Sequence, residues 1–224
     1  MIPWQRIDTT TIPGSTQQLR LLQRGDEFSI RGEGFELMNS RQHASEDTLA
    51  RLACGCLAGR PNISMLIGGL GMGFTLTAAL KELGADSRVA VAELVPAVVR
   101  WNRGPLAGLA GNPLADGRVT VYETDIAGML KSAAVVYDAI LFDVDNGPNG
   151  LTRQENDWLY GAGGLKEAYT ALRLGGVLAV WSASSDSGFS FHLRRTGFSV
   201  EEILTPVRRS RKGGRHTIWL AFRD

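Results

Sequence analysis

The stretch that decides the fold is SMLIGGLGMGFTLTAAL, residues 64–80, which has four glycines between positions 68 and 73. An apolar run precedes these glycines, and a segment of helix-forming residues follows them. Glycine accepts positive φ and lets another molecule approach the main chain, and the start of a helix presents free N–H groups. The stretch is therefore typical of a strand-to-helix turn that binds a ligand. A tight turn without a ligand would explain the same residues.

Apolar runs alternate with helical segments from residue 62 onward. The pattern predicts strands at 63–67, 89–93, 119–122, 139–142 and 176–181, and helices at 73–83, 96–103, 126–132 and about 153–174. Strands without a polar face, separated by helices, are typical of a doubly wound, mostly parallel α/β sheet. The last two runs, GFSVEEILTPV and RHTIWLAFRD, have no helix between them and predict a C-terminal antiparallel hairpin.

The first 40 residues have a different pattern. Residues 1–26 predict an extended arm, and apolar runs at 28–30 and 35–38 around RGEG predict one short β-hairpin. A helix is expected from Ser45, as the N-cap, to Gly59. The chain is therefore expected to divide into an arm with a hairpin, residues 1–40, and one α/β domain, residues 41–224.

Composition excludes several classes of partner. The 224 residues include 24 Lys and Arg against 23 Asp and Glu, so bulk charge does not favour nucleic acid or a membrane surface. Cys54 and Cys56 are one residue apart, which would strain a disulfide, and no matching Cys or His pair makes a zinc site. We expect both cysteines to be buried on a helix, with no metal. Because the chain also lacks a secretory signal and an apolar run of about 20 residues, we predict a cytoplasmic protein.

The segment VRRSRKGGR, residues 207–215, is the one strongly basic stretch. It would suit contacts to RNA phosphates, or it is the solvated tip of the last hairpin. No aromatic residues are interleaved with the cations, so we favour the hairpin tip and expect no nucleic-acid partner.

The glycine spacing separates three classes of ligand. A P-loop requires a Lys-Ser/Thr pair that is absent here. A dinucleotide site, G-x-G-x-x-G, would need glycine where Phe74 stands, and the register is instead G-x-G-x-G from Gly69 to Gly73. The dinucleotide and P-loop interpretations are therefore disfavoured.

Acids follow the next two predicted strands. Glu93 ends the second strand, where a carboxylate can accept from both hydroxyls of a ribose, and Asp125 follows the third, where it can accept from an adenine amino group. Glu93 is equally explained as a solvated acid at a strand end, and Asp125 as a helix N-cap. The glycines and the two acids at successive strand ends together predict a nucleoside site.

Five segments together resemble the successive motifs of the spermidine-synthase-like branch of the class I S-adenosylmethionine-dependent transferases: MLIGGLGMGFT, VAVAELVPAVVRWNR, VTVYETDIAGML, YDAILFDVDNGP and GGLKEAYTALRLGGVLAVW. The resemblance runs from about residue 37 to the C-terminus. It implies a Rossmann-like sheet of seven strands that binds S-adenosylmethionine or its decarboxylated form, without a metal. By position it implies that Gly69, Gly71 and Gly73 face the methionine part, Glu93 the ribose, Asp125 and Ile126 the adenine, and Gln42 and His43 the sulfonium end. Leu94 is also expected among the cofactor-binding residues.

The loop after the fourth strand bears on which group is transferred. Aminopropyl transfer needs a base that removes a proton from the amine, because an ammonium has no lone pair. Spermidine synthases have D-S-x-D-P-x-G-P in this loop, and Asp143 matches its first, catalytic acid. Asp145 comes one residue early, and Asn146-Gly147 replaces Asp-Pro, which weakens the match to a diamine site. Asp143 is alternatively a strand-end acid that caps nearby backbone.

Polyamine synthases also have a larger β-domain before the sheet, whereas one hairpin is expected here. The lid of the amine site would then be missing or come from another subunit, in a homodimer. We therefore predict methyl transfer to a small polar acceptor, held by Asp143, Asp145, Asn146 and His43. The alternatives are aminopropyl transfer from decarboxylated S-adenosylmethionine and a nucleoside-binding protein without activity.

Overall fold

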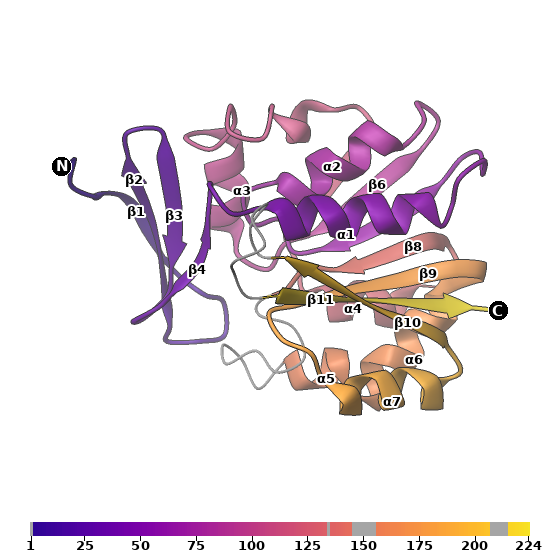
Figure 1. The fold of residues 1–224 in the computed structure, drawn as a ribbon. Helices are drawn as coiled ribbons and strands as arrows, with labels where there is room; N and C mark the ends of the chain where they lie inside the picture. The colour runs from indigo at the N-terminus through magenta and orange to yellow at the C-terminus, as the bar shows by residue number, and fades with distance from the viewer. Residues whose placement is uncertain (1, 134, 145–155, 207–214) are drawn as a thin grey trace.

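The structure, a computed structural model, describes residues 2–133, 135–144, 156–206 and 215–224. It consists of a seven-stranded sheet with helices on both faces and a four-stranded antiparallel sheet formed by the N-terminal residues. The smaller sheet stands beside one end of the larger one, and the C-terminus lies at the opposite end (Figure 1). Among the described residues, no helix is long and apolar enough to cross a membrane.

The larger sheet has the strand order β10-β11-β9-β8-β5-β6-β7. Strands β5 to β9 pair in parallel, and β11 is antiparallel to both β9 and β10, which confirms the predicted fold class and C-terminal hairpin. The chain runs from β5 outward to β7 and then returns to β8 on the other side of β5. Ligands bind at such a reversal, beyond the carboxyl ends of the strands. The bounds are β5 Ser64–Gly68, β6 Arg88–Ala92, β7 Val119–Tyr122, β8 Tyr137–Phe142, β9 Leu172–Ser182, β10 Ser199–Pro206 and β11 Arg215–Arg223.

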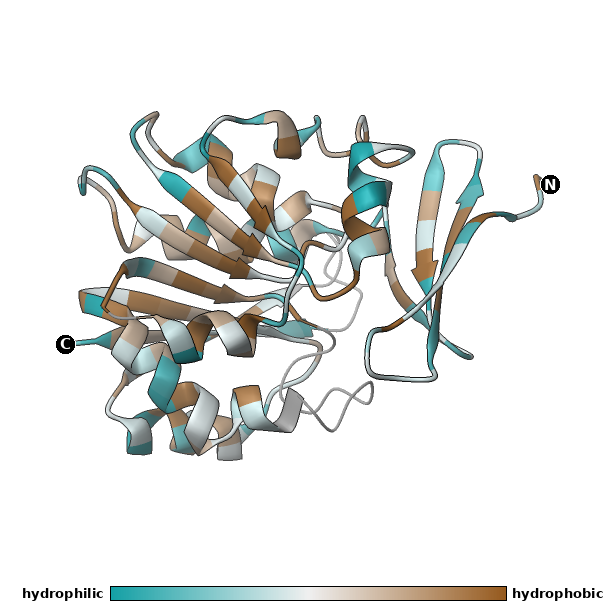
Figure 2. Ribbon diagram, turned by 180° about the vertical axis from the view of Figure 1, so that it is seen from behind, coloured by the Kyte–Doolittle hydropathy of each residue, from teal (hydrophilic) through white to brown (hydrophobic). Residues whose placement is uncertain are grey.

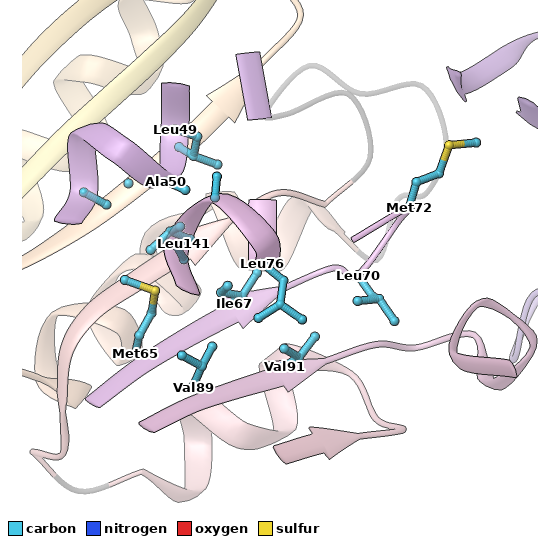
Figure 3. Close-up of a cluster of buried hydrophobic side chains, with 14 of the residues drawn as sticks. Leu49, Ala50, Met65, Ile67, Leu70, Met72, Leu76, Val89, Val91 and Leu141 are labelled. Carbon is cyan, nitrogen blue, oxygen red and sulfur yellow. The ribbon is translucent and has the colours of Figure 1, made fainter. Parts of the chain in front are cut away.

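Helices cover both faces of this sheet because successive residues of each buried strand point to opposite sides. Met65 and Ile67 of β5 pack in the core under α1 and α2, and Leu66 packs in the second core under α4 and α6. Figure 3 shows Leu76 of α2 close to Ile67 in the first of these cores. Apolar residues accordingly run along the central strands (Figure 2). The helices are α1 Ala44–Gly55, α2 Phe74–Glu82, α3 Pro96–Arg103, α4 Ile126–Ser132, α5 Asn156–Tyr160, α6 Ala162–Ala171 and α7 Ser187–Thr196, with a 3₁₀ turn at Pro113–Ala115.

The N-terminal region is larger than the arm and single hairpin expected from the sequence. Its strands pair in chain order as β1 Gln5–Thr11, β2 Gln18–Arg24, β3 Glu27–Arg31 and β4 Glu36–Asn39. In β2, Leu19 and Leu21 are buried while Gln18 and Arg20 are exposed, which gives this strand one face toward a core. Trp101 of α3 donates its indole N–H to Asp8 at 2.7 Å and so ties β1 to the larger sheet. The β-region judged missing from the sequence is therefore present.

Several predicted element boundaries also shift. Helix α1 begins at Ala44, with His43 rather than Ser45 at the N-cap. The single helix expected over 153–174 is instead two helices, α5 and α6, and it ends earlier than predicted because β9 begins at Leu172. Cys54 is buried as expected, but Cys56 follows the end of α1 and is exposed. The basic segment 207–214 and the loop 145–155 lie outside the described residues.

Candidate active site

A cavity of about 330 Å³ lies where the carboxyl ends of the parallel strands face the N-terminal sheet. Most of the predicted site residues line it. They come from the β5–α2 loop, from the ends of β6, β7 and β8, and from the segment before α1: Gly69, Gly71, Glu93, Leu94, Asp125, Ile126, Asp143 and Gln42. The N-terminal sheet closes the opposite side with residues that include Leu19, Ile30, Phe35 and Met38. This wall includes the β3–β4 hairpin, which was predicted from the sequence, and β2, which was not.

The glycine loop after β5 packs its backbone closely against the backbone that follows β8. Gly69 has φ +88°, and a Cβ at this position would collide with the carbonyl oxygen of Asp143. A Cβ at Gly71 would lie 2.6 Å from the terminal methyl of Met38. Gly73, at φ +82°, does not line the cavity, because it is the N-cap of α2 and faces Asn102 and Pro113. Gly69 and Gly71 are therefore the glycines placed to face a ligand.

Glu93 is not a solvated acid at a strand end, since it is only 8% exposed. Its two carboxylate oxygens accept hydrogen bonds from the amides of Leu70, at 2.9 Å, and Val95, at 2.8 Å. These bonds fix the carboxylate in the cavity wall. A carboxylate offers about four acceptor positions, so one held by two amides is suited to ribose hydroxyls as well.

Asp125 is a helix N-cap and also lines the cavity. Its side chain accepts from the amide of Ala127 at 2.8 Å at the start of α4, which confirms the cap predicted from the sequence. Ile126 is buried below the glycine loop, where a Cβ on Gly68 would meet its side chain. The exposed acid and the buried apolar residue form an edge suited to a flat base with an amino group.

Two carboxyl groups that influence each other electrostatically, those of Glu46 and Asp143, line the cavity. Asp143 follows β8, and the hydroxyl of Thr75 donates to it at 2.5 Å. Glu46 lies in the first turn of α1 and accepts from the hydroxyl of Ser45 at 2.6 Å. Burial raises the pKa of Asp143 to about 6, and burial together with the charge of Asp143 raises the pKa of Glu46 to about 7. Such a pair holds a proton near neutral pH.

Glu46 was missed from the sequence because acids are common in the first turn of any helix. One signal for it was available, since Glu46 stands four residues after Gln42 in the segment that resembles the sulfonium side. Both residues line the cavity.

His43 lies elsewhere, in contrast to the sequence prediction. Its ring stacks on Phe74 at 4.0 Å, and its Nδ1 atom lies 3.2 Å from a carboxylate oxygen of Asp47. It lines a separate depression together with Trp4, because helix α1 begins here and turns the side chain outward. Asp145 and Asn146, also predicted at the acceptor, lie outside the described residues.

Two further residues of the cavity were not among the site residues predicted from the sequence. Trp181 at the end of β9 and His216 in β11 both line it, and their rings meet edge to face at 4.7 Å. Burial lowers the pKa of His216, which favours the neutral imidazole. Among the described residues, no group of three or more His, Cys, Asp or Glu side chains is placed to hold a metal ion.

Solved structures of other proteins share the fold that carries this site. No family model and no curated protein matches the sequence. A spermidine synthase from Thermotoga maritima matches with a TM-score of 0.77 at 18% identity, over 98% of this chain and 73% of that one. The fold is that of the spermidine synthases. The motif resemblance found in the sequence is thereby confirmed at the level of fold.

Two other synthase structures match over nearly the whole chain, and a methyltransferase matches over a smaller part. A spermidine synthase in complex with the transition-state analogue AdoDATO matches with a TM-score of 0.76 at 18% identity, over 98% of this chain and 72% of that one. A probable spermidine synthase from Corynebacterium glutamicum gives 0.67 at 16% identity, over 97% and 80%. A precorrin-6y C5,15-methyltransferase from Geobacter metallireducens gives 0.53 at 15% identity, over 77% and 87%. The coverage of the synthases includes the N-terminal sheet, whereas the methyltransferase matches less of this chain.

Proposed function

We propose that this protein is an aminopropyltransferase, which moves the aminopropyl group of decarboxylated S-adenosylmethionine to an amine acceptor. The observation that carries the proposal is the pair of carboxyl groups, Glu46 and Asp143, in the cavity beyond the glycine loop. An amine must lose a proton before it can attack, and an acid pair at this place can accept it. The N-terminal sheet supports the same choice, because it supplies the wall that a polyamine site needs.

The charge of the cavity favours the decarboxylated donor. Among the described residues that line it, five are acids and none is Lys or Arg; the acids are Glu36, Glu46, Glu93, Asp125 and Asp143. S-adenosylmethionine has a carboxylate that would find no cationic side chain here, whereas its decarboxylated form ends in an ammonium. Opposite charges at close range are favourable in a partly buried site. Methyl transfer, the main expectation from the sequence, is therefore the second candidate.

The nucleoside would be held by the residues at three strand ends. Glu93 is placed for the ribose hydroxyls, Asp125 for the adenine amino group, and the backbone at Gly69 and Gly71 for the chain that leads to sulfur. The donor supplies an alkyl carbon bound to a positively charged sulfur, which leaves as a neutral thioether. This chain's contribution is to hold that carbon in line with the amine.

Asp143 acts as the base in this reaction. The acceptor ammonium gives one proton to the Asp143 carboxylate, and Thr75 holds that carboxylate in place. The freed lone pair forms the new C–N bond while the C–S bond breaks and its electron pair goes to sulfur. The product nitrogen keeps its two protons as a secondary ammonium, and the proton on Asp143 passes to solvent. The charge of Asp143 is one cause of the raised pKa of Glu46, so protonation of Asp143 favours the charged form of Glu46 and the site stays negative.

Methyl transfer has one specific observation in its favour. The sequence after Asp143 departs from the spermidine-synthase pattern, with Asp145 one residue early and Asn146-Gly147 in place of Asp-Pro. A changed loop would suit a changed acceptor as well as a changed donor.

Incubation with decarboxylated S-adenosylmethionine and a set of primary amines, followed by mass spectrometry, tests the proposal. We expect acceptors that are heavier by an aminopropyl group, in amounts equal to the methylthioadenosine formed. Asp143→Asn should abolish both products while leaving methylthioadenosine binding unchanged. Methylated acceptors made from S-adenosylmethionine, with no aminopropyl product, would overturn the proposal.

A further inference from the structure

The order of the strands in the larger sheet fixes the order of the residues along the cavity. The strands along this edge run β7, β6, β5, β8, β9 and β11. The residues predicted to hold the nucleoside follow β5, β6 and β7, and Asp143 follows β8. Beyond Asp143 the cavity continues to Trp181 at the end of β9 and His216 in β11. An acceptor whose amine lies at Asp143 therefore extends toward these two rings.

The strand register fixes the distance available to that acceptor. Phe142 of β8 pairs with Val180 of β9, so Asp143 and Trp181 follow paired residues on neighbouring strands. Trp181 in turn pairs with Ile218 of β11, two residues after His216. Neighbouring strands lie about 4.8 Å apart, so β8 and β11 are separated by roughly 10 Å. This span suits an acceptor with a chain of a few carbons between its two ends.

Trp181 and His216 each have a buried side-chain nitrogen whose hydrogen-bonding capacity is unsatisfied. Neither the Nε1 atom of Trp181 nor the Nδ1 atom of His216 has a hydrogen-bond partner within the described part of the chain, although both atoms are buried. Buried polar atoms are paired in nearly all proteins, so an unpaired couple in a cavity wall points to a ligand group. The two rings are in contact, so the two unpaired nitrogens belong to one part of the cavity wall.

The chemistry of the two nitrogens selects the kind of group. An indole N–H can only donate, so the ligand atom at Trp181 must accept. A neutral imidazole can donate or accept at Nδ1, according to its tautomer. An ammonium has three donors and no acceptor, so it cannot satisfy the indole. A carboxylate would be repelled by Glu46 and Asp143 nearby, which leaves an uncharged oxygen.

The acid on the N-terminal sheet does not restore a diamine site. Glu36 also lines the cavity, but its carboxylate accepts from the hydroxyl of Ser29 at 2.6 Å and from the amide of Asn39 at 2.8 Å. It also lies 3.5 Å from the guanidinium of Arg31, which offsets its charge. A second ammonium of the acceptor would thus meet an acid that is already engaged.

We propose that Trp181 and His216 form a specificity subsite for an uncharged oxygen, a hydroxyl or an amide carbonyl, at the far end of the amine acceptor. The acceptor is then an amino alcohol or an amino amide rather than a diamine. This inference rests on the proposed transfer to an amine, and it names the class of acceptor. Trp181 and His216 act as specificity residues, away from the amine that reacts.

Calorimetry of the full-length protein saturated with methylthioadenosine tests this subsite. Three acceptors of equal chain length serve as probes: aminobutanol, aminobutanamide and diaminobutane. We expect aminobutanol or aminobutanamide to bind about tenfold more tightly than diaminobutane, as one well-formed hydrogen bond allows. Trp181→Phe keeps an aromatic ring but removes the N–H, and should cancel most of this preference. Trp4→Phe is the matched control, because Trp4 packs against Arg24 and Arg31 outside the cavity, and should change nothing.

A pair of variants at His216 separates hydrogen bonding from packing. His216→Asn keeps a polar group near the position of Nδ1 and should retain the preference, whereas His216→Phe should lose it. Tightest binding of diaminobutane by the unaltered protein would overturn the subsite, as would an equal loss for all three probes in Trp181→Phe or no binding of any probe. These outcomes are distinct from the fate of the proposed function. If a diamine is preferred and is aminopropylated, the proposed function is supported and the subsite is contradicted. If aminobutanol binds preferentially but receives no aminopropyl group, the subsite is supported and the proposed function is contradicted.

Discussion

The hydroxyl of Thr75 donates to the carboxylate of Asp143 across 2.5 Å, and so joins the first turn of α2 to the end of β8. This bond favours the charged form of Asp143 against the burial that raises its pKa to about 6. Thr75→Val removes the donor and leaves the shape, so the pKa of Asp143 should rise further. The base form then appears only at higher pH. We expect the acid side of the pH profile of kcat to move to higher pH, with little change in KM.

Thr75→Ser is the control for this shift, because serine keeps the hydroxyl. Its pH profile should match that of the unaltered protein. An identical profile in Thr75→Val would mean that Asp143 is not the group whose ionisation limits the reaction.

Glu46→Gln should change how stability depends on pH. The folded pKa of Glu46, about 7, is above its ordinary value of 4.5, so the folded state binds more protons than the unfolded state between these values. Stability is therefore lost as the pH rises from about 5 to about 7, on the order of 2 kcal/mol for a partly buried carboxyl. Glutamine has no proton to lose, and this loss should disappear. Urea unfolding of both proteins at pH 5 and pH 8 measures it, and equal losses in the two would contradict the placement of Glu46.

Glu93→Gln should weaken nucleoside binding, because one oxygen that accepts both an amide and a ribose hydroxyl is replaced by an NH₂ group. The expected loss in the affinity for methylthioadenosine is about 1–3 kcal/mol, measured by calorimetry. Glu123→Gln is the control, since Glu123 is an exposed acid after β7 that does not line the cavity. Unchanged affinity in Glu93→Gln would return Glu93 to a purely structural role.

Gly69→Ala should destabilise the protein through two separate effects. A side chain at φ +88° is strained, and the new Cβ would collide with the carbonyl of Asp143. Gly59→Ala isolates the first effect, because Gly59 has φ +82° with nothing within 4 Å of the added Cβ. We expect a loss of roughly 1 kcal/mol for Gly59→Ala and about 2–4 kcal/mol for Gly69→Ala in urea unfolding. Equal losses would show that the loop can move away from β8.

The larger sheet was predictable because its strands carry their own pattern. The apolar runs at β5 and β8, separated by helices, predicted a parallel sheet without knowledge of any contact. Strand β1 has no such pattern, since QRIDTTT is mostly exposed in the structure as well. It is a strand because β2 pairs with it, and a partner along the chain is not visible in the periodicity of one segment.

The nucleoside side of the site could likewise be predicted, and the acceptor side could not. Glu93 and Asp125 stand at fixed places after strands, so the topology alone brings them to one edge. Glu46 reaches Asp143 only through the packing of α1 on the sheet, and Trp181 reaches His216 only through the antiparallel pairing of β9 with β11. Contacts of this kind depend on tertiary structure, which local patterns do not contain.

Competition between the two donors is the measurement that tests the central claim most directly. The protein is given equal amounts of S-adenosylmethionine and its decarboxylated form together with an amine acceptor, and the nucleoside products are separated. The account predicts methylthioadenosine and no S-adenosylhomocysteine, because the acids of the cavity favour the donor that ends in an ammonium. Formation of S-adenosylhomocysteine without methylthioadenosine would contradict it.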